Sequence, residues 1–363
     1  PFSFMTTPPS APHPSRQGQE RPLLLTMGDA VGIGPEIIVK AFAAGQAHDV
    51  VVVGDVAVLR RAAALVPRAP AVVNLSELSQ ASAALQAGHL PVWAPARLSA
   101  ELDPLPWGQV DARCGQAAAR CIEEAVALIQ GGHASALVTA PLHKEALSAA
   151  GVNYPGHTEM LQALAAPKGQ AVPPVRMMLA NDQLKVVLVT IHLSLRKALD
   201  AVTFEAVLQT LRIADRAARV WGEAPRIAVA GLNPHAGEGG LFGDEEITTI
   251  APAIAAARQE GINAQGPFAP DTVFMRARHA PNHPGEFDLV VAMTHDHGLI
   301  PVKYLGVEQG VNVTLGLPFV RTSPDHGTAF DIAGTGQADP SSLCAALQTA
   351  RKMAAKMGSR PGG

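Results

Sequence analysis

The sequence has few cysteines, no concentrated positive charge and no long apolar run, and each shortage excludes a class of protein. Its three cysteines, Cys114, Cys121 and Cys344, form neither a metal-type pair nor a disulfide framework, so a reduced, cytoplasmic protein is expected. With 28 basic and 31 acidic residues the net charge is −3, and no run of Lys and Arg provides a nucleic-acid footprint. No uninterrupted apolar stretch reaches the roughly 18 residues of a membrane-spanning helix. The first residues also lack the basic-then-apolar order of a secretory signal.

What the chain does have is the composition of a packed globule. Hydrophobic residues make up 48% and charged residues 16% of its 363 residues, which favours burial over disorder. At roughly 150 residues per domain, this length predicts two domains. Residues 1–21 are rich in Pro, Ser and Gln and are expected to form a flexible tail, as are residues 358–363.

Short apolar runs alternate with helical stretches along the chain. The runs with the length of buried strands are Leu23–Thr26, Val50–Val53, Ala136–Thr139, Lys185–Thr190, Arg226–Ala230 and Leu289–Met293. The helical stretches include Ala112–Gln130, Phe204–Val220, Glu245–Gln259 and Ser342–Met357. This alternation, with few turn-linked hairpins, predicts an α/β protein with a largely parallel sheet. The best candidate for a domain boundary is the stretch 151–156.

A glycine-rich loop follows the first predicted strand. From Gly28 to Glu36 it reads GDAVGIGPE, in which the glycines permit tight turns while Pro35 and Glu36 suit the first turn of a helix. Ligands of α/β folds gather at such strand ends. The chain contains neither a G-x-G-x-x-G fingerprint nor a Walker loop, and a plain strand-to-helix turn explains the segment equally well.

Four of the 13 histidines stand in loops that follow apolar strands: His157, His192, His235 and His295. Because parallel strands deliver their carboxyl ends to one edge of a sheet, these side chains are expected to converge. Three neutral imidazoles would suit a catalytic divalent ion, with Zn, Co or Ni favoured over Mg, and His297 is a spare ligand. The alternative is that each histidine only caps its strand through a hydrogen bond to a turn. Surface positions are expected for His13, His48, His89, His133, His279 and His283.

The stretch from Lys303 to Gly336 concentrates polar groups around a short apolar strand. Lys303, Asn312 and Arg321 are cationic or amide side chains that suit a phosphate or carboxylate, although two solvated surface charges would explain the cations as well. Asp325 is then expected to open a helix. The backbone N–H groups of that helix start would hold a ligand's polar atoms, unless Asp325 merely caps the helix.

In combination, these motifs resemble one family. The segment DHGTAFDIAGTGQADP, residues 325–340, is similar to the adenosine-binding loop of isocitrate and isopropylmalate dehydrogenases, and GIGPE resembles the opening of the same superfamily. The full set resembles the PdxA family of 4-hydroxythreonine-4-phosphate dehydrogenases over about residues 23–356. The motifs that carry this resemblance are TMGD, GIGPE, TAPLHKEAL, YPGHTE, GLNPHAGEGG, PDTVF, HDHG and NVTLGLPFVRTSPDHGTA.

The resemblance implies a fold and a domain arrangement. It implies a two-domain α/β/α fold like that of isocitrate and isopropylmalate dehydrogenases, with central, largely parallel sheets and an active-site cleft between the domains. The first domain would comprise residues 22–150 and 322–357, and the second residues 151–321. The enzyme would be a homodimer, with the active site at the subunit interface and metal ligands drawn from both subunits.

The resemblance also implies which residues form the site. A divalent metal (Zn, Co, Ni, Mn or Mg) would be bound by His192, His235 and His295. Substrate would be bound by His157, Thr158, Lys303, Asn312 and Arg321. NAD, with NADP as the alternative, would be bound by a non-Rossmann loop through Asp325, His326, Gly327, Thr328, Asp331 and Ile332. Lys303 or His157 would transfer the proton, with Asp271 as a group that orients it.

The implied reaction is a metal-dependent oxidation of a phosphorylated four-carbon hydroxy acid. The main prediction is oxidation of 4-phosphohydroxy-L-threonine to 2-amino-3-oxo-4-phosphooxybutanoate, which decarboxylates to 3-amino-2-oxopropyl phosphate in pyridoxine 5′-phosphate biosynthesis. The alternative is D-threonate or D-erythronate 4-phosphate in sugar-acid catabolism, because His297 stands where the vitamin B6 enzymes usually carry Gln. A hypothesis from another class is a metal-dependent binding protein or hydrolase without NAD chemistry, against which the intact DHGTAFDIAG loop argues.

Overall fold

The computed structural model describes residues 21–358, apart from residues 97, 99–100, 167–168 and 307. The expected tails therefore fall almost entirely outside the described residues. Within the described part of the chain, no helix combines the length and the apolarity that crossing a membrane requires.

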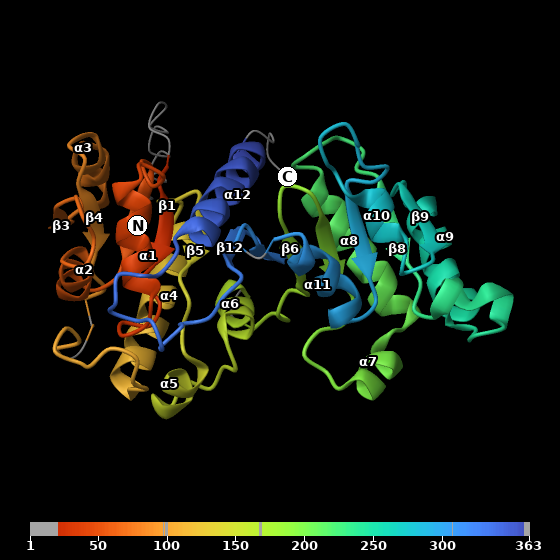
Figure 1. Cartoon of the computed structure of the whole chain (residues 1–363), viewed down its shortest axis with the longest axis horizontal. Coiled ribbons are helices and arrows are strands. Elements are labelled where there is room, and N and C mark those ends of the chain that lie inside the picture. The colour runs from red at the N-terminus through yellow and green to blue at the C-terminus, as the bar shows by residue number, and fades with distance from the viewer. Residues whose placement is uncertain (1–20, 97, 99–100, 167–168, 307, 359–363) are drawn as a thin grey trace, which may run out of the picture.

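The described strands form one twelve-stranded sheet that runs along the long axis of the molecule (Figure 1). Their spatial order is β3 (Val72–Asn74), β4 (Leu90–Trp93), β2 (Val50–Val53), β1 (Leu23–Thr26), β5 (Ala136–Thr139), β12 (Val320–Pro324), β11 (Val311–Leu315), β6 (Arg176–Ala180), β7 (Lys185–Leu188), β10 (Leu289–Ala292), β8 (Ile227–Ala230) and β9 (Ala264–Phe268). Two parallel blocks, β3 to β12 and β7 to β9, are joined through the antiparallel strands β11 and β6. The largely parallel α/β architecture predicted from the sequence is confirmed.

Helices cover both faces of the sheet. One face carries α1 (Gly34–Ala43), α2 (Val56–Ala63), α8 (Phe204–Ala218), α9 (Ala251–Gln259) and α12 (Ser341–Gly358). The other carries α4 (Ala112–Gln130), α5 (Lys144–Ala149) and α6 (His157–Ala165) over the first block, and α10 (Val273–Ala277) and α11 (His295–Tyr304) over the second. The short helices α3 (Ala81–Gln86) and α7 (Leu195–Ala201) lie next to β4 and after β7. Strand side chains alternate between the faces, so Leu23 and Leu25 enter the first core while Leu24 enters the second.

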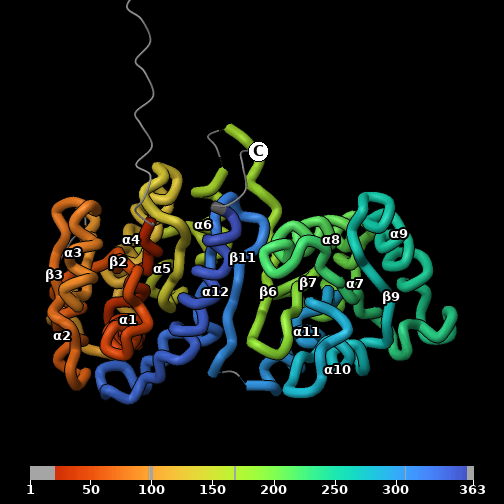
Figure 2. The backbone as a smooth tube through the Cα atoms, turned by 90° about the horizontal axis from the view of Figure 1, so that it is seen from above, coloured from red at the N-terminus to blue at the C-terminus, as the bar shows by residue number. Residues whose placement is uncertain are grey.

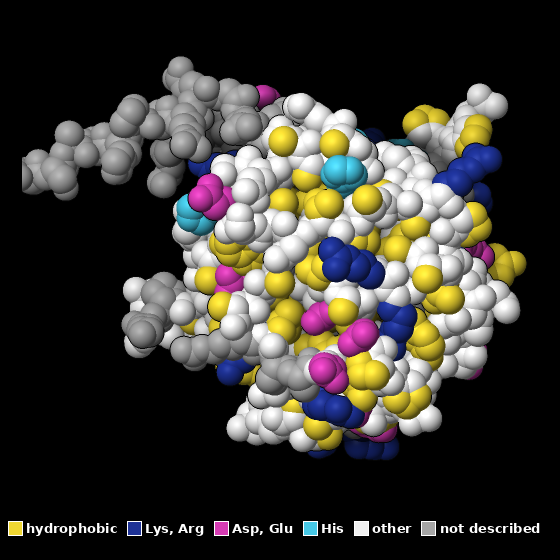
Figure 3. Space-filling model, turned by 90° about the vertical axis from the view of Figure 1, so that its left-hand side faces the viewer, with side chains coloured by type: hydrophobic (Ala, Val, Ile, Leu, Met, Phe, Trp, Pro, Cys, Tyr) yellow, Lys and Arg dark blue, Asp and Glu magenta, His cyan; other side chains and the backbone are white. Residues whose placement is uncertain are grey.

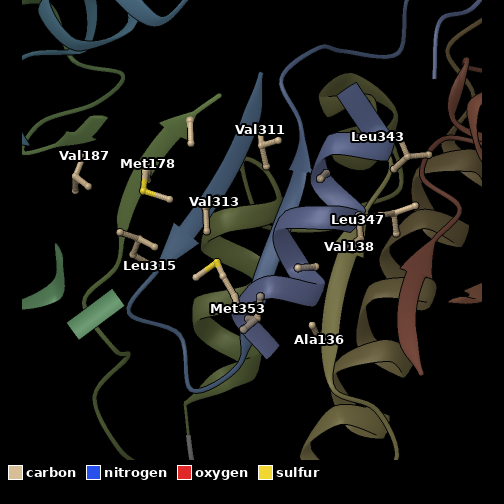
Figure 4. Close-up of a cluster of buried hydrophobic side chains, with 14 of the residues drawn as sticks. Ala136, Val138, Met178, Val187, Val311, Val313, Leu315, Leu343, Leu347 and Met353 are labelled. Atoms are coloured by element: carbon tan, nitrogen blue, oxygen red, sulfur yellow. The ribbon is translucent and has the colours of Figure 1, made fainter. Parts of the chain in front are cut away.

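The C-terminal helix α12 returns to the middle of the molecule, where it lies beside β11 between the two blocks (Figure 2). Figure 4 shows Leu343, Leu347 and Met353 of this helix gathered with side chains of β5, β6 and β11. These residues belong to one buried cluster that extends into both blocks. The two parts of the chain are therefore packed on a shared core.

Charged side chains are scattered over the face at the β3 end of the molecule (Figure 3). Basic and acidic groups alternate there with apolar ones, as the small net charge of −3 leads one to expect. This face offers no basic stripe of the kind that follows a nucleic-acid backbone.

Most predicted elements are confirmed, and the exceptions lie where the chain reverses. β1, β2, β5 and α4 have the predicted bounds, and most of the others agree to within a residue or two. The helix predicted over Glu245–Gln259 is a π-helical turn, η3 (Glu246–Ile250), followed by α9. The prediction that Asp325 opens a helix is wrong. Residues 325–336 form bends and turns, in which some backbone groups make short bonds three residues apart and others bond to Ile33 and Glu36, and α12 begins only at Ser341.

Candidate active site

His192 and His295 meet at the carboxyl edge of the second parallel block. They follow the neighbouring strands β7 and β10, and their ring centroids lie 5.6 Å apart. The Nδ1 atom of His295 is 2.8 Å from Oδ1 of Asp296, and both rings line a cavity of about 450 Å³ together with His297. The predicted convergence is thus observed for this pair.

The backbone and the charge state of His192 suit a ligand role. Its φ is +50°, a left-handed conformation that non-glycine residues rarely adopt and that is frequent at functional sites. Burial lowers the pKa of His192, and electrostatic interactions with Lys144 and His295 lower it further while Glu159 opposes them. The imidazole is therefore neutral near pH 7 with a lone pair available for a metal.

His235 lies apart from this pair, on the turn η2 (Pro234–Gly240). It is exposed, its φ is +53°, and its ring centroid is 6.2 Å from that of Phe242. The turn is held by the buried carboxylate of Glu246, which accepts hydrogen bonds from the backbone N–H groups of Leu232 and Asn233. Burial alone would raise the pKa of Glu246, but these bonds and that of the Asn233 amide lower it overall. Within the described residues of one chain, no three His, Cys, Asp or Glu side chains are close enough to hold a metal.

Arg321 is a buried cation without a carboxylate partner among the described residues. Its side chain donates to Oγ1 of Thr314 at 3.0 Å and of Thr139 at 2.7 Å, while its Nε has no partner in the described structure. The residue is only 4% exposed, and burial lowers the pKa of its guanidinium to about 10. An unpaired buried charge is costly, so this arrangement favours a site that an anionic ligand completes.

His157 and Thr158 are the first two residues of α6. Nε2 of His157, at the start of α6, is buried and has no hydrogen-bond partner among the described residues. Burial and the charge of Arg321 hold the pKa of His157 well below its usual value. Thr158 and Thr314 line a cavity of about 140 Å³ that shares Ile191 with the cavity of the histidine pair. The cavity lined by Thr158 and by Thr314, which accepts a hydrogen bond from Arg321, therefore adjoins the cavity of the histidine pair.

The other predicted substrate and proton-transfer residues are more dispersed. Lys303, in the last turn of α11, donates a hydrogen bond to the carboxylate of Asp325 and so joins the second block to the predicted cofactor loop. Asn312 is half-buried in β11. Asp271 is exposed in the loop before α10, and no hydrogen bond joins its carboxylate to Lys303, to His157 or to another described residue.

The predicted cofactor loop, residues 325–338, is fastened to α1. The N–H of Ile33 donates to the carbonyl of Thr328 at 3.0 Å. The buried carboxylate of Glu36 accepts from the N–H groups of Gly336 and Ala338, at 3.2 and 2.8 Å. Lys40 adds hydrogen bonds to the carbonyls of the same two residues. The two glycine-rich segments noted in the sequence thus form one structure.

Within the described residues, this loop has open space and unpaired polar groups that a ligand could occupy. Nε2 of His326 is buried without a partner among the described residues, and the space beside Gly327 is open. Asp331 and Ile332 lie in the turns that follow, where the carbonyl of Ile332 accepts from the N–H of Thr335. The loop therefore fits a dinucleotide held through backbone and imidazole groups.

Sequence reasoning missed several residues at this site. His143 stacks on Phe330 with ring centroids 4.6 Å apart, and its Nδ1 has no partner in the described structure. Asp29 is 1% exposed with one unpaired carboxylate oxygen, and burial raises its pKa. Lys144 and Glu159 lie near enough to His192 to act on its charge. The sequence did contain a pattern that could have identified two of them. Asp29 and Lys144 follow the predicted strands β1 and β5, in the segments TMGD and TAPLHKEAL.

Comparisons with known proteins agree on one family. The model of the "Pyridoxal phosphate biosynthetic protein PdxA" matches residues 46–350. The chain is 53% identical over 337 residues to a 4-hydroxythreonine-4-phosphate dehydrogenase of Beijerinckia indica, covering 92% of this chain and 95% of that protein. It is 46% identical to a D-threonate 4-phosphate dehydrogenase of Pectobacterium atrosepticum, covering 92% of this chain and 99% of that protein. A crystal structure of 4-hydroxythreonine-4-phosphate dehydrogenase from Klebsiella pneumoniae is similar at 44% identity and a TM-score of 0.79, covering 92% of this chain and all of that one.

Proposed function

This chain belongs to the PdxA family, and from that membership we propose that it is the NAD-dependent dehydrogenase of 4-phosphohydroxy-L-threonine. The product, 2-amino-3-oxo-4-phosphooxybutanoate, would then lose CO2 to give 3-amino-2-oxopropyl phosphate. The observation that carries the proposal is the buried guanidinium of Arg321, which pairs with no carboxylate of the described chain and bonds Thr314 in the cavity adjoining that of the histidine pair. A substrate with both an anionic group and a hydroxyl group would satisfy both parts of this site.

The histidines fit a divalent metal. His192 and His295 of one copy would hold the ion, and His235 of a second copy would complete the set, because one chain brings only two of the three together. Imidazole nitrogens suit Zn, Co and Ni better than Mg. A bound ion would lower the pKa of the substrate hydroxyl and polarise the carbonyl formed from it.

A homodimer with the site at its interface accounts for the exposed apolar side chains near His192 and near His235. Leu193, Leu195 and Leu199 surround His192, and Leu241 and Phe242 follow His235 on the chain. Such clusters mark interaction surfaces on otherwise polar proteins. All three cysteines are unpaired, which supports the predicted reducing, cytoplasmic compartment.

The loop 325–338 would hold NAD, which supplies the acceptor for the substrate's hydride. Arg321 would orient the substrate by bonding its anionic group, and His157, neutral because it is buried beside Arg321, would act as hydrogen-bond partner or base. Lys303 would hold or release a proton near the reacting carbon while Asp325 keeps its ammonium in place. Which of the two transfers the proton stays a prediction, as does the orienting role of Asp271.

A second substrate class has specific support. Relatives of similar identity include D-threonate 4-phosphate dehydrogenases, and His297 lines the cavity of the histidine pair. A polar change next to the carbon that bears the amine or hydroxyl group of the substrate is enough to shift preference between these acids.

The experiment is a comparison of substrates. Purified protein loaded with Zn, Co or Mg is mixed with NAD and with 4-phosphohydroxy-L-threonine, D-threonate 4-phosphate or D-erythronate 4-phosphate, and NADH is followed. A higher kcat/KM for the amino-acid phosphate supports the proposal. A preference for the sugar-acid phosphates moves the enzyme to catabolism, and no NADH from any of them contradicts the dehydrogenase assignment in favour of a binding protein or hydrolase.

A further inference from the structure

A second cavity, of about 480 Å³, lies at the opposite edge of the sheet from the histidine pair. It opens between α12 and the turn that joins β6 to β7, and it shares no lining residue with the two cavities of the active site. Lys185, the first residue of β7, lines the cavity, whereas His192 stands in the loop after Leu188, the last residue of that strand. Figure 2 shows α12 beside β11, with β6 and β7 next along the sheet.

One face of α12 forms a wall of this cavity. Ser341, Cys344, Ala345, Gln348, Thr349 and Lys352 all line it. Their spacing is that of residues on a single side of a helix. The opposite wall comes from Asn181, Lys185 and Trp221, so the cavity is enclosed by both halves of the chain.

Two ammonium groups face this space. The side chains of Lys185 and Lys352 form no hydrogen bond or ion pair with any other described residue. Lys185 is half-buried, and burial together with the charge of Lys352 lowers its pKa, although Asp288 and Asp182 counteract this. Of those two acids, Asp288 is already paired with Arg226. Asp182 also lines the cavity, so the lining carries two lysines against one carboxylate and is positive overall.

The cavity also presents an aromatic face and neutral polar groups. Nζ of Lys185 lies over the ring of Trp221, 5.3 Å from its centroid, so the charge faces the indole. Gln348, Gln46 and Thr349 supply further donors and acceptors at the rim. A ligand with one anionic end and one flat ring would contact the lysines and the indole at once.

We propose that this cavity is a binding site for a small aromatic anion, a phosphate ester or carboxylate, that is separate from the active site. The anion would lie between Lys185 and Lys352, and its ring would lie against Trp221. Because the walls belong to both halves of the chain, an occupant would link α12 to the β6–β7 turn.

The test is a calorimetric titration of the full-length protein with phenyl phosphate in the absence of NAD. Lys185→Gln and Lys352→Gln should each weaken binding about tenfold, since each removes one charge-assisted hydrogen bond. Lys356→Gln is the matched control, because this lysine is exposed one turn further along α12 and does not line the cavity. Inorganic phosphate should bind more weakly than phenyl phosphate, and benzylamine should not bind.

A second readout separates this cavity from the active site. Cys344 lines the cavity while Cys114 and Cys121 are fully buried, so phenyl phosphate should slow maleimide labelling of Cys344 about fivefold. This protection should persist in Arg321→Gln and be lost in the Lys185→Gln, Lys352→Gln double variant. Unchanged affinity in the lysine variants, or protection that depends on Arg321, would overturn the proposal. Circular dichroism and thermal melting show whether each variant is folded.

Discussion

At the scale of single residues, Arg321 combines a cost to folding stability with a site for an anionic ligand. Its guanidinium is buried among hydroxyl groups, and no carboxylate of the described chain neutralises it. A charge in that position contributes little to folding and a great deal to the binding of an anion. We therefore infer that anion binding, and not packing, accounts for the presence of Arg321.

Replacing Arg321 with Met should therefore separate activity from stability. The melting temperature of the ligand-free protein should stay the same or rise, because an unpaired buried charge is removed. The value of kcat/KM for the phosphorylated substrate should fall at least about a hundredfold, since a bidentate charged contact is lost. Arg120→Met, which breaks an exposed pair with Glu123 on α4, is the control and should change neither quantity. Strong destabilisation by Arg321→Met without loss of activity would contradict this interpretation.

His157 should make the stability of the protein sensitive to acid. Its pKa in the folded state lies well below the ordinary value of 6.5 because of burial and the nearby Arg321. The unfolded chain therefore binds a proton that the folded chain does not, and stability is lost as the pH falls below about 6.5, by up to about 1.4 kcal/mol per pH unit.

Urea unfolding of the wild type and of His157→Gln between pH 7.5 and 5.5 measures this contribution. The free energy of unfolding of the wild type should fall more steeply with decreasing pH than that of the variant. The control is His48→Gln, an exposed histidine away from the site. Parallel curves for the wild type and His157→Gln would show that His157 takes up no proton on unfolding.

At the scale of elements, helix α1 anchors a loop from the other end of the chain. Lys40 donates to Glu36 at 2.8 Å and to the carbonyls of Gly336 and Ala338 at 2.8 and 2.6 Å. Both side chains are largely buried, so these bonds are shielded from water. The loop that would hold NAD therefore depends on this helix for its shape.

Lys40→Met should loosen the loop without altering the anion site. The Michaelis constant for NAD should rise about tenfold and the free energy of unfolding fall by about 3 kcal/mol, because the charge of Glu36 stays buried without its cation. The Michaelis constant for the phosphorylated substrate should change little. NAD titrations and urea unfolding, with Arg120→Met again as control, measure both effects. An unchanged affinity for NAD would show that the loop does not hold the cofactor.

At the scale of the whole molecule, the separation of His235 from His192 and His295 points to assembly. One copy provides two ligands at the cavity and offers the third on an exposed turn beside Phe242. In a symmetric dimer, each interface would bring the turn of one copy to the cavity of the other.

Mixing two inactive variants tests this arrangement. His192→Ala and His235→Ala should each be inactive and bind less metal, because each removes one ligand. Unfolded together and refolded, they should recover about a quarter of wild-type activity, since about half of the random dimers are mixed and each mixed dimer has one intact site. Mixing His192→Ala with His295→Ala should restore nothing, because both ligands come from the same copy. No recovery in the first mixture would place all three ligands in one chain.

The local sequence pattern was sufficient to predict those helices and strands that depend on residues close together in the sequence. Buried parallel strands such as Val50–Val53 and the long helix Ala112–Gln130 follow from hydrophobicity and period alone, and their predicted bounds are those observed. The same pattern located His192 and His295 at strand ends, and parallel pairing of β7 with β10 is enough to bring them together. The family resemblance added which residues to select.

Only the tertiary structure decided the features that depend on distant contacts. Residues 325–336 have the composition of a helix start, yet Glu36, 300 residues before Gly336, bonds their backbone into turns. The antiparallel strands β6 and β11, the burial of Arg321 without a carboxylate, and the isolation of His235 likewise depend on which segments meet. Local sequence specifies hydrophobic period and turn residues, whereas partners far along the chain are selected by packing and by the pairing of buried polar groups.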